Sequence, residues 1–361
     1  MTEEQEDILS LYGVPGIGAK TFARLAARFG SAGTVFGSSK KELMQMEGIG
    51  PVLAGNILSH DRRSYIRNQK RLMEKAGASI LTRLCKDYPP LLNAFPSAPP
   101  VLFIRGDVQV LKKDTIAFVG TRKPSPYGIK MAKKLVEGVV DSGFCVISGM
   151  AEGIDSAAHR TAIDHGGYTV AVFGCGVDII FPVFNRGLSE KITKSGCLLS
   201  HFPMGTRCSP GNFPARNSVI VGLSQATVVV EAPKKSGALI TAELTLKAGR
   251  TLFAVPGNAD VETCKGTNNL FTKGAQPVSN TNDILALLGK PAPKPPKKTK
   301  RSPVLPGLAG DILKTLDKEP LHIESICRII GKSVSEILSE LTRLEIEGHI
   351  TQNPGKIFEK N

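Results

Sequence analysis

The chain has 361 residues and a formal net charge of +14. This length fits two or three domains with a sizeable core, and the basic charge favours a polyanionic partner over a neutral metabolite. No apolar run approaches the roughly 20 residues that a membrane span needs, and the acidic segment after Met1 is unlike a signal peptide. The seven scattered cysteines form no CxxC pair, so the sequence predicts a cytoplasmic protein with reduced thiols and no membrane partner.

Residues 1–83 are predicted to form a helical domain of the helix-hairpin-helix type. Val-Pro-Gly-Ile-Gly at 14–18 and Met-Glu-Gly-Ile-Gly at 46–50 each lie between helical stretches. In such a hairpin the glycines permit a tight turn whose N–H groups meet a DNA phosphate. Short hairpins of this kind also serve protein contacts, so a docking domain stays open as an alternative.

A predicted helix after the second hairpin carries a broad basic face. Its basic residues recur at mixed helical spacings, which suits either DNA or a solvated surface. They are Arg62, Arg63, Arg67, Lys70, Arg71 and Lys75.

Residues 84–289 are predicted to form an α/β core with an extended Rossmann-like, doubly wound parallel sheet. After a Pro-rich connector, short continuous apolar runs alternate with helical patterns, which is typical of a parallel sheet buried on both faces. Ligands of such sheets bind beyond the carboxyl ends of the strands. The predicted strands are residues 116–119, 145–148, 169–173, 198–200, 227–230 and 252–255.

Residues 290–306 are predicted to be a disordered basic linker, because Pro and Lys dominate this segment. Residues 307–361 then show three helical patterns and a hairpin, which is the order of a winged helix-turn-helix. Ser333 and Glu336 form a candidate capping box at the start of the third helix.

The third helix of this tail has the wrong charge for reading a DNA groove. Carboxylates on a recognition helix would repel phosphates, so protein docking or a vestigial wing is favoured over duplex reading. The charged residues concerned are Glu336, Glu340, Glu345, Glu347 and the single Arg343.

Turns at the predicted carboxyl edge of the sheet carry features that bind phosphate. A buried strand that stops at a Gly- or Ser-rich turn and enters a helix presents free N–H groups at the positive end of the helix dipole. The clearest such unit runs from Phe144 to Asp155. In the turn of Gly120, Thr121 and Arg122, the guanidinium can hold a phosphate bidentately or pair with a carboxylate. Ser236 and Gly237 open another helix, either as an anion site or as an ordinary turn.

Phe213-Pro214-Ala215-Arg216-Asn217 brings an aromatic ring, a guanidinium and an amide together before an apolar helical pattern. An exposed Phe stacks on bases with about 1–3 kcal/mol each, regardless of base sequence. A buried Phe213 would only fill the core.

The sequence predicts no cofactor and no metal site. The turn at Gly120 is not a GxGxxG motif, no GxxxxGK[ST] motif occurs, and the six histidines show no ligand spacing. His159 follows Asp155 by four residues on one helical face, which favours a structural His–Asp hydrogen bond over an acid–base pair.

Taken together and in order, these turns resemble the core of the DNA-processing protein A (DprA/Smf) family over about 200 residues. The three-part layout of helical domain, Rossmann-like core and winged helix is similar too. The motifs that carry the resemblance are Gly120-Thr121-Arg122, Ser148 to Asp155 with Ala158-His159, Gly174-Cys175-Gly176, Phe213 to Asn217, Glu231-Ala232 with Ser236-Gly237 and Thr241-Ala242, and Pro256-Gly257 with Gly266-Thr267-Asn268 and Gly274-Ala275.

The resemblance implies sequence-independent binding of single-stranded DNA and loading of the RecA recombinase onto it during natural transformation. It also implies a homodimer formed through the core and no enzymatic activity. Arg122 and Phe213 would contact DNA, with the other matched residues lining the same pocket: Gly120, Thr121, Arg216, Asn217, Ser236 and Gly237.

Three positions depart from the family pattern around this expected pocket. His201 stands where the family has Glu, Ser218 stands where it has Arg, and Pro210 stands where Lys or Arg is frequent. Arg207 is a candidate to compensate for the last of these. The departures concern single contacts of the pocket and leave the predicted fold unchanged.

Two other functions remain open. The segment from Ser236 to Glu243 is similar to a loop of nucleoside-phosphate N-glycosidases on the same kind of sheet, with Glu243 as the acid, although the diglycine expected there is missing. Alternatively, the chain is an adaptor whose basic linker and wing recruit proteins while the core binds nothing.

Overall fold

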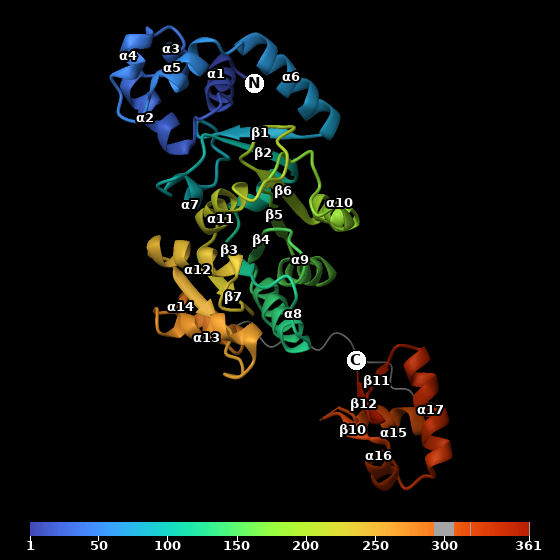
Figure 1. Cartoon of the computed structure of the whole chain (residues 1–361). Helices are drawn as coiled ribbons and strands as arrows, with labels where there is room; N and C mark the ends of the chain where they lie inside the picture. The colour runs from blue at the N-terminus through green and yellow to red at the C-terminus, as the bar shows by residue number, and fades with distance from the viewer. Residues whose placement is uncertain (292–306, 318, 361) are drawn as a thin grey trace. The chain divides into compact units, whose positions relative to one another are not determined.

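The computed structural model describes residues 1–291, 307–317 and 319–360. The chain forms two compact units, Met1–Pro293 and Lys294–Asn361 (Figure 1). The linker predicted at residues 290–306 lies almost wholly outside the described residues. Within the described part, no helix has the length and apolar character needed to cross a membrane.

The first unit is built on a nine-stranded, mostly parallel sheet with the strand order β1-β2-β6-β5-β4-β3-β7-β8-β9. All six predicted strands are confirmed to within two residues, and the predicted doubly wound fold is correct. The strands are β1 Ser79–Thr82, β2 Val101–Gly106, β3 Thr115–Val119, β4 Cys145–Ser148, β5 Thr169–Val172, β6 Gly196–Ser200, β7 Ala226–Val229, β8 Thr251–Ala254 and β9 Gln276–Pro277.

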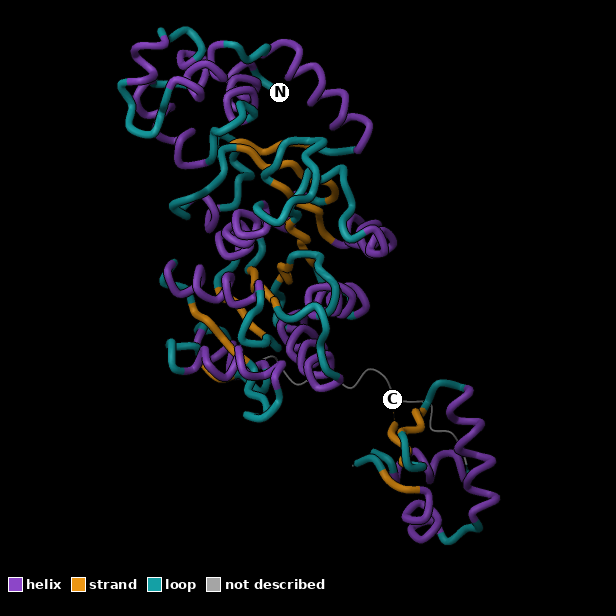
Figure 2. The backbone as a smooth tube through the Cα atoms, viewed as in Figure 1, coloured by secondary structure: helices purple, strands orange, loops and turns teal. Residues whose placement is uncertain are grey.

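Successive residues of each strand are buried on opposite faces, which is why the strands are apolar throughout. On β3, Ile116 and Phe118 pack with α8, α9 and α14, whereas Ala117 packs with α11 on the other face. Figure 2 shows helices on both sides of the strands. The helices of this unit after β1 are α7 Pro90–Asn93, α8 Pro126–Asp141, α9 Ile154–Asp164, α10 Arg186–Ser195, α11 Asn212–Leu223, α12 Gly237–Lys247, α13 Lys265–Phe271 and α14 Thr281–Leu287, with the 3-10 turns η1 Val108–Lys112, η2 Val183–Asn185 and η3 Glu262–Cys264.

The edges of the sheet differ from the sequence-based prediction. Residues 79–82, at the end of the stretch predicted as helical, form β1, which pairs antiparallel with β2 inside the segment predicted as a connector. Strand β2 pairs antiparallel with β6, so a parallel sheet acquires an antiparallel edge. The β1–β2 pairing joins residues about 20 positions apart and the β2–β6 pairing residues about a hundred positions apart, and no local pattern predicts either.

The direction of strand progression reverses between β3 and β7. From β3 the chain winds outward through β4, β5 and β6, and then returns by α11 to place β7 and β8 on the other side of β3. In an open α/β sheet, this switch opens a crevice beyond the carboxyl ends of the two central strands. Both the Gly120 turn and the Ser236 turn follow these strands.

Helices before β1 form a layer that packs against β2, β5 and β6. Both predicted hairpins lie between helices, the first after α1 and the second after α4, and Gly16 and Gly48 adopt the positive φ angles that a glycine turn allows. Gln69 joins the layer to the core by bonding both the N–H (3.0 Å) and the carbonyl (3.3 Å) of Met204. The helices are α1 Glu3–Tyr12, α2 Ala19–Phe29, α3 Ala32–Val35, α4 Lys40–Met44, α5 Pro51–Leu58 and α6 Arg62–Ala76.

The basic face predicted on α6 is partly neutralised within the protein. Arg62 pairs with Asp7, and Lys70 pairs with Glu6 at 2.5 Å, both partners lying on α1. Two of the six basic side chains therefore stabilise the helical layer, which weakens the case for α6 as a DNA-binding surface.

The second unit has the predicted winged-helix order. The capping box is confirmed: Ser333 Oγ accepts from the Glu336 N–H, and the Glu336 carboxylate accepts from the Ser333 N–H at 3.1 Å. Arg343 on α17 is held by Glu340 (3.3 Å) and Glu347 (3.4 Å). The elements are α15 Leu308–Thr315, β10 Leu321–His322, α16 Ile323–Ile330, α17 Val334–Ile346, β11 Ile350–Asn353 and β12 Ile357–Lys360.

Candidate nucleic-acid interface

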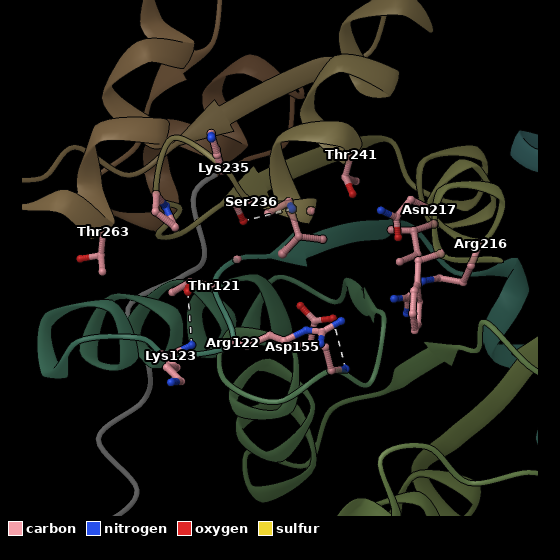
Figure 3. A pocket seen from close by; sticks show the side chains of 18 residues that line it. Thr121, Arg122, Lys123, Asp155, Arg216, Asn217, Lys235, Ser236, Thr241 and Thr263 are labelled. Atoms are coloured by element: carbon pink, nitrogen blue, oxygen red, sulfur yellow. Dashed lines mark hydrogen bonds between the residues drawn. The ribbon is translucent and has the colours of Figure 1, made fainter. Parts of the chain in front are cut away.

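The residues predicted from sequence for DNA binding meet in one hollow of about 560 Å³ at the β3/β7 switch point (Figure 3). They come from segments up to 117 positions apart in the sequence, and Figure 3 shows the labelled side chains, among them Arg122, Asn217 and Ser236, around a common space. All eight line this hollow: Gly120, Thr121, Arg122, Phe213, Arg216, Asn217, Ser236 and Gly237.

The turn after β3 is tied to the end of β7, and its amides are largely satisfied within the protein. The N–H of Thr121 donates to the carbonyl of Glu231 at 2.7 Å, and the N–H of Lys123 donates to Thr121 Oγ1 at 3.2 Å. The buried Glu231 carboxylate accepts from the N–H of Ser125 at 2.9 Å. The expectation that this turn offers free N–H groups to phosphate is therefore wrong for these three amides.

In the turn after β4, backbone N–H groups are likewise bonded to a carboxylate of the protein. Asp155, buried at the start of α9, accepts from the N–H groups of Gly149 (3.2 Å) and Ala151 (3.3 Å). Burial raises the pKa of Asp155, although the Arg216 charge and these hydrogen bonds act in the opposite direction. The two amides of this turn that could bind an anion are therefore already bonded to Asp155.

The predicted hydrogen bond between His159 and Asp155 is wrong. His159 is fully buried on α9, and its Nδ1 lies 2.7 Å from Thr169 Oγ1 at the start of β5. Burial lowers the pKa of His159 to about 3, so the ring is neutral and structural. The i, i+4 spacing predicted correctly only that Asp155 and His159 lie on the same face of α9. The hydrogen-bond partner of His159 depends on how β5 packs against this helix.

Arg216 lies under the floor of the hollow, with 6% of the residue exposed. Its Nη1 donates to the carbonyl oxygens of Gly149 and Val172, the latter at 2.9 Å, and so joins the ends of β4 and β5. A Cβ at Gly149 would overlap this Nη1 and would lie 2.8 Å from Oδ2 of Asp155, which explains the glycine. Burial lowers the pKa of Arg216, and the Asp155 charge acts to raise it.

Phe213 is half-buried at the start of α11 and has two guanidinium groups near its ring. The Arg122 carbon Cζ lies 5.8 Å from the ring centre, and that of Arg216 lies 5.6 Å from it. Such contacts orient the ring and are worth about 0.5–2 kcal/mol each. Phe213 is therefore not a core residue, and its ring is held in place by the two guanidinium groups.

Helix α12 leaves one amide donor at the hollow, that of Gly237, because its next two N–H groups are bonded within the protein. Ser236 is its N-cap, and Ser236 Oγ accepts from the N–H of Ala238 at 3.3 Å. The first N–H groups of a helix have no acceptor in the preceding turn; the Leu239 N–H donates to the Ser236 carbonyl at 3.1 Å, and Gly237, whose N–H has no partner among the described residues, lines the hollow. The positive end of an eleven-residue helix dipole thus lies at the wall of the hollow.

The lining is strongly basic and open to solvent. Arg122, Lys123 and Lys235 are exposed, whereas Arg216 is buried, and Asp155 is the one acid among the described lining residues. Exposed cations near a helix N-terminus attract phosphate, and an adjacent oriented ring accepts a base. The arrangement fits a polymer of phosphates and flat apolar groups.

Sequence reasoning missed several residues of this hollow. Lys123 could have been found as a cation next to Arg122, because it extends the same turn. Asp155 was identified as the end of the motif from Ser148 and as a supposed partner of His159, but not as a residue of the site. Thr241 and Thr263 line the hollow through the packing of α12 and of the η3 segment, which no sequence spacing indicates.

Residues tied to the alternative interpretations lie elsewhere. Glu243, the acid required by the glycosidase hypothesis, is half-exposed and pairs with Lys273 at 3.6 Å, and among the described residues it does not line the hollow. His201 and Ser218, which depart from the family pattern, line a separate hollow between α2 and α11. Pro210 lies in the turn before α11. Within the described residues, no cluster of His, Cys, Asp and Glu could hold a metal ion.

Comparison with known proteins places the chain in a family. The model of the DNA recombination-mediator protein A family matches residues 79–289, and that of the DprA winged helix domain matches residues 290–356. Protein Smf from Synechocystis is 32% identical over 99% of both chains. The DNA processing protein DprA from Streptococcus pneumoniae is 38% identical over 55% of this chain and 70% of its own length.

Solved structures agree with these matches. The crystal structure of DprA from Streptococcus pneumoniae has a TM-score of 0.70 and 29% identity, covering 79% of this chain and 98% of that one. DNA processing protein A from Helicobacter pylori, whose structure concerns its single-stranded DNA binding mode, has a TM-score of 0.53 and 29% identity, covering 58% of this chain and 95% of that one. The chain therefore belongs to the DNA processing protein A family, whose members are also called Smf.

Proposed function

We propose that this protein binds single-stranded DNA, independently of base sequence, in the hollow at the β3/β7 switch point. The observation that carries the proposal is the convergence of all eight predicted residues on one open, basic hollow. The single-stranded DNA binding mode described for the Helicobacter pylori relative supports it. Arg122, Lys123 and Lys235 neutralise phosphates, the Gly237 N–H at the start of α12 adds an amide donor, and Phe213 stacks on a base.

Single strands are favoured over duplex because of the aromatic ring. In a duplex the bases are stacked and paired, so Phe213 could reach none of them without distortion, whereas a single strand can present an unstacked base. The backbone contacts carry no base information. The site therefore accepts any sequence.

A salt series tests the proposal. Wild type should bind single-stranded DNA more tightly than duplex near physiological salt, and Arg122→Ala should bind more weakly with a slope of log K against log [salt] reduced by about one unit. Lys133→Ala on α8 is the matched control, because it removes one exposed positive charge away from the hollow. Equal affinity for duplex and single strand, or an Arg122 variant that behaves like the control, would overturn the proposal.

We further propose that the DNA-bound protein loads the RecA recombinase and acts as a homodimer through the core, without enzymatic activity of its own. The family membership supports these roles. Filament formation by RecA on single strands that are already covered by a single-strand-binding protein should be accelerated by wild type and not by Arg122→Ala. Sedimentation of residues 1–293 should give a dimer mass, and a monomer would contradict the core as the interface.

We also propose domain boundaries at about residues 83, 289 and 306, with the exception that β1, Ser79–Thr82, belongs to the sheet of the core. Limited proteolysis should cut first between residues 290 and 306. A first cut inside residues 84–289 would contradict these boundaries.

A further inference from the structure

We infer that Phe181 and Phe184 continue the aromatic surface of Phe213 and carry a DNA single strand out of the hollow. The inference rests on the proposed function and adds a second binding segment, which consists of Phe181, Pro182 and the 3-10 turn η2 after them. Phe181 is 45% exposed and Phe184 is 63% exposed, and Val183 between them is 67% exposed. Large apolar side chains that are exposed together indicate a binding surface.

The exposed rings are continuous with the proposed DNA site. The centres of the Phe181 and Phe213 rings are 6.5 Å apart, and their planes are inclined by 39°. A smaller hollow of about 90 Å³ is lined by Phe181, Phe184 and Phe213 and shares Arg122 and Arg216 with the larger one. The rings therefore extend the same surface instead of forming a separate patch.

Basic residues lie at both ends of this aromatic surface. Arg122 lies at the Phe213 end, and beyond Phe184 a third hollow of about 270 Å³ is lined by Arg160 and Lys191. Two acids, Glu152 and Asp164, line the same two smaller hollows. The basic residues outnumber the acids, and rings alternating with cations match a strand of bases and phosphates better than they match an apolar protein segment.

The segment that carries the rings is fixed from beneath. Asn185, at the end of η2, is fully buried, and its Nδ2 donates to the carbonyl of Met150 (3.0 Å) and to Ser156 Oγ (2.9 Å). These bonds attach η2 to the turn after β4 and to α9. The rings therefore stay exposed because their backbone is held, and a strand that stacks on them orders little else on binding.

The inference predicts an effect that depends on the length of the DNA. Short oligonucleotides occupy the main hollow alone, so Phe181→Ala/Phe184→Ala should bind them like wild type, whereas Arg122→Ala and Phe213→Ala should not. As oligo-dT is lengthened from about 4 to about 16 nucleotides, the affinity of wild type should rise by roughly fivefold to 150-fold for each ring that stacks on a base. The double variant should lack this rise.

Control variants separate stacking from other causes. Tyr168→Ala removes an equally exposed aromatic residue, 43% exposed, that lies before β5 with Lys113 4.3 Å from its ring centre, and it should bind every length like wild type. Phe181→Leu/Phe184→Leu keeps apolar bulk without a flat ring and should lose most of the gain with length. Unfolding midpoints of all variants should match wild type, because the changed rings are exposed.

The outcomes distinguish this inference from the proposed function. If the double Ala variant binds all lengths like wild type while Phe213→Ala binds weakly, the hollow binds DNA but the extension is wrong, and a protein partner would be the occupant of the rings. Equal weakening at every length would also overturn it, because the rings would then act within the main hollow. If Arg122→Ala and Phe213→Ala also bind like wild type, the proposed function itself fails. Full recovery of the gain by the Leu variant would rule out stacking.

Discussion

The guanidinium carbon of Arg216 lies 5.6 Å from the centre of the Phe213 ring, three positions earlier in α11. The same guanidinium donates to the carbonyl of Val172 at 2.9 Å. One buried side chain therefore joins the ends of two strands and supports the ring that we propose stacks on DNA. Loss of Arg216 should affect stability and binding together, which separates it from Arg122.

Arg216→Ala is expected to destabilise the core by about 3 kcal/mol, because it leaves buried carbonyls unpaired and removes the positive charge beside Asp155. DNA affinity should fall as well, even for the folded fraction, because Phe213 loses its support. Urea unfolding followed by circular dichroism measures the first effect, and titration with oligo-dT measures the second. An Arg216→Ala protein of wild-type stability would show that these bonds contribute little.

Gly149→Ala should be destabilising by about 1–3 kcal/mol, because a Cβ would overlap Nη1 of Arg216, which two backbone carbonyls hold in place. The control is Gly55→Ala in α5, where a Cβ meets nothing within 4 Å. That change should stabilise the protein by about 0.4–1 kcal/mol through the entropy of the unfolded chain. Both are read from urea midpoints, and equal effects of the two substitutions would refute the packing argument.

Two buried histidines predict the pH dependence of stability. Burial and the nearby Arg216 charge lower the pKa of His201 to about 4 and that of His159 to about 3, whereas an unfolded histidine titrates at about 6.5. The folded state thus binds fewer protons than the unfolded state. The stability contributed by the neutral rings is present above about pH 6.5 and is lost as the pH falls toward the folded pKa values.

The expected slope is about 1.4 kcal/mol per pH unit for each histidine between about pH 4 and pH 6.5. His201→Gln should remove one such contribution and His159→Gln the other, so each variant should show a flatter curve of unfolding free energy against pH. Urea unfolding at several pH values measures this. A variant curve parallel to the wild-type curve would mean that the substituted histidine has the same pKa in both states, so that folding does not lower it.

The winged unit is expected to contribute little to DNA affinity. Helix α17 presents glutamates, and its Arg343 is held by Glu340 and Glu347. A variant that ends at residue 306 keeps the basic linker. Its affinity for single-stranded DNA should therefore stay within about twofold of the wild-type value at the same salt concentration, where a tenfold change would correspond to about 1.4 kcal/mol. A larger loss would show that the wing binds DNA after all.

Glu243→Gln tests the remaining enzymatic interpretation. Glu243 pairs with Lys273 on the surface, so the variant should bind oligo-dT like wild type. Wild type incubated with nucleoside monophosphates should release no free base. Release of base by wild type, and its loss in the variant, would revive the N-glycosidase hypothesis.

Much of the fold followed from local chemistry. Six continuous apolar strands and the helical stripes between them predicted the doubly wound sheet, because burial on both faces requires that pattern. The glycine hairpins between α1 and α2 and between α4 and α5, and the capping box of Ser333 and Glu336, were also predicted, because each is defined within a few residues.

The predicted site residues lie together because strand ends of a parallel sheet share one edge, which the order of the motifs already implied. Their individual tasks did not follow from the sequence. Whether an amide is free depends on which carboxylate folds over it, and Asp155 and Glu231 take the amides of two turns that were expected to hold phosphate.

The sequence by itself determined the classes of element, the family and the set of residues at the switch point, since all three are encoded in short motifs and their order. Tertiary structure alone decided that β1 and β2 close the sheet antiparallel, that Arg216 faces backbone carbonyls, and that Phe181 lies 6.5 Å from Phe213. These relationships join residues that are far apart in the chain. They depend on how buried side chains share space and hydrogen-bond partners, which no local pattern records.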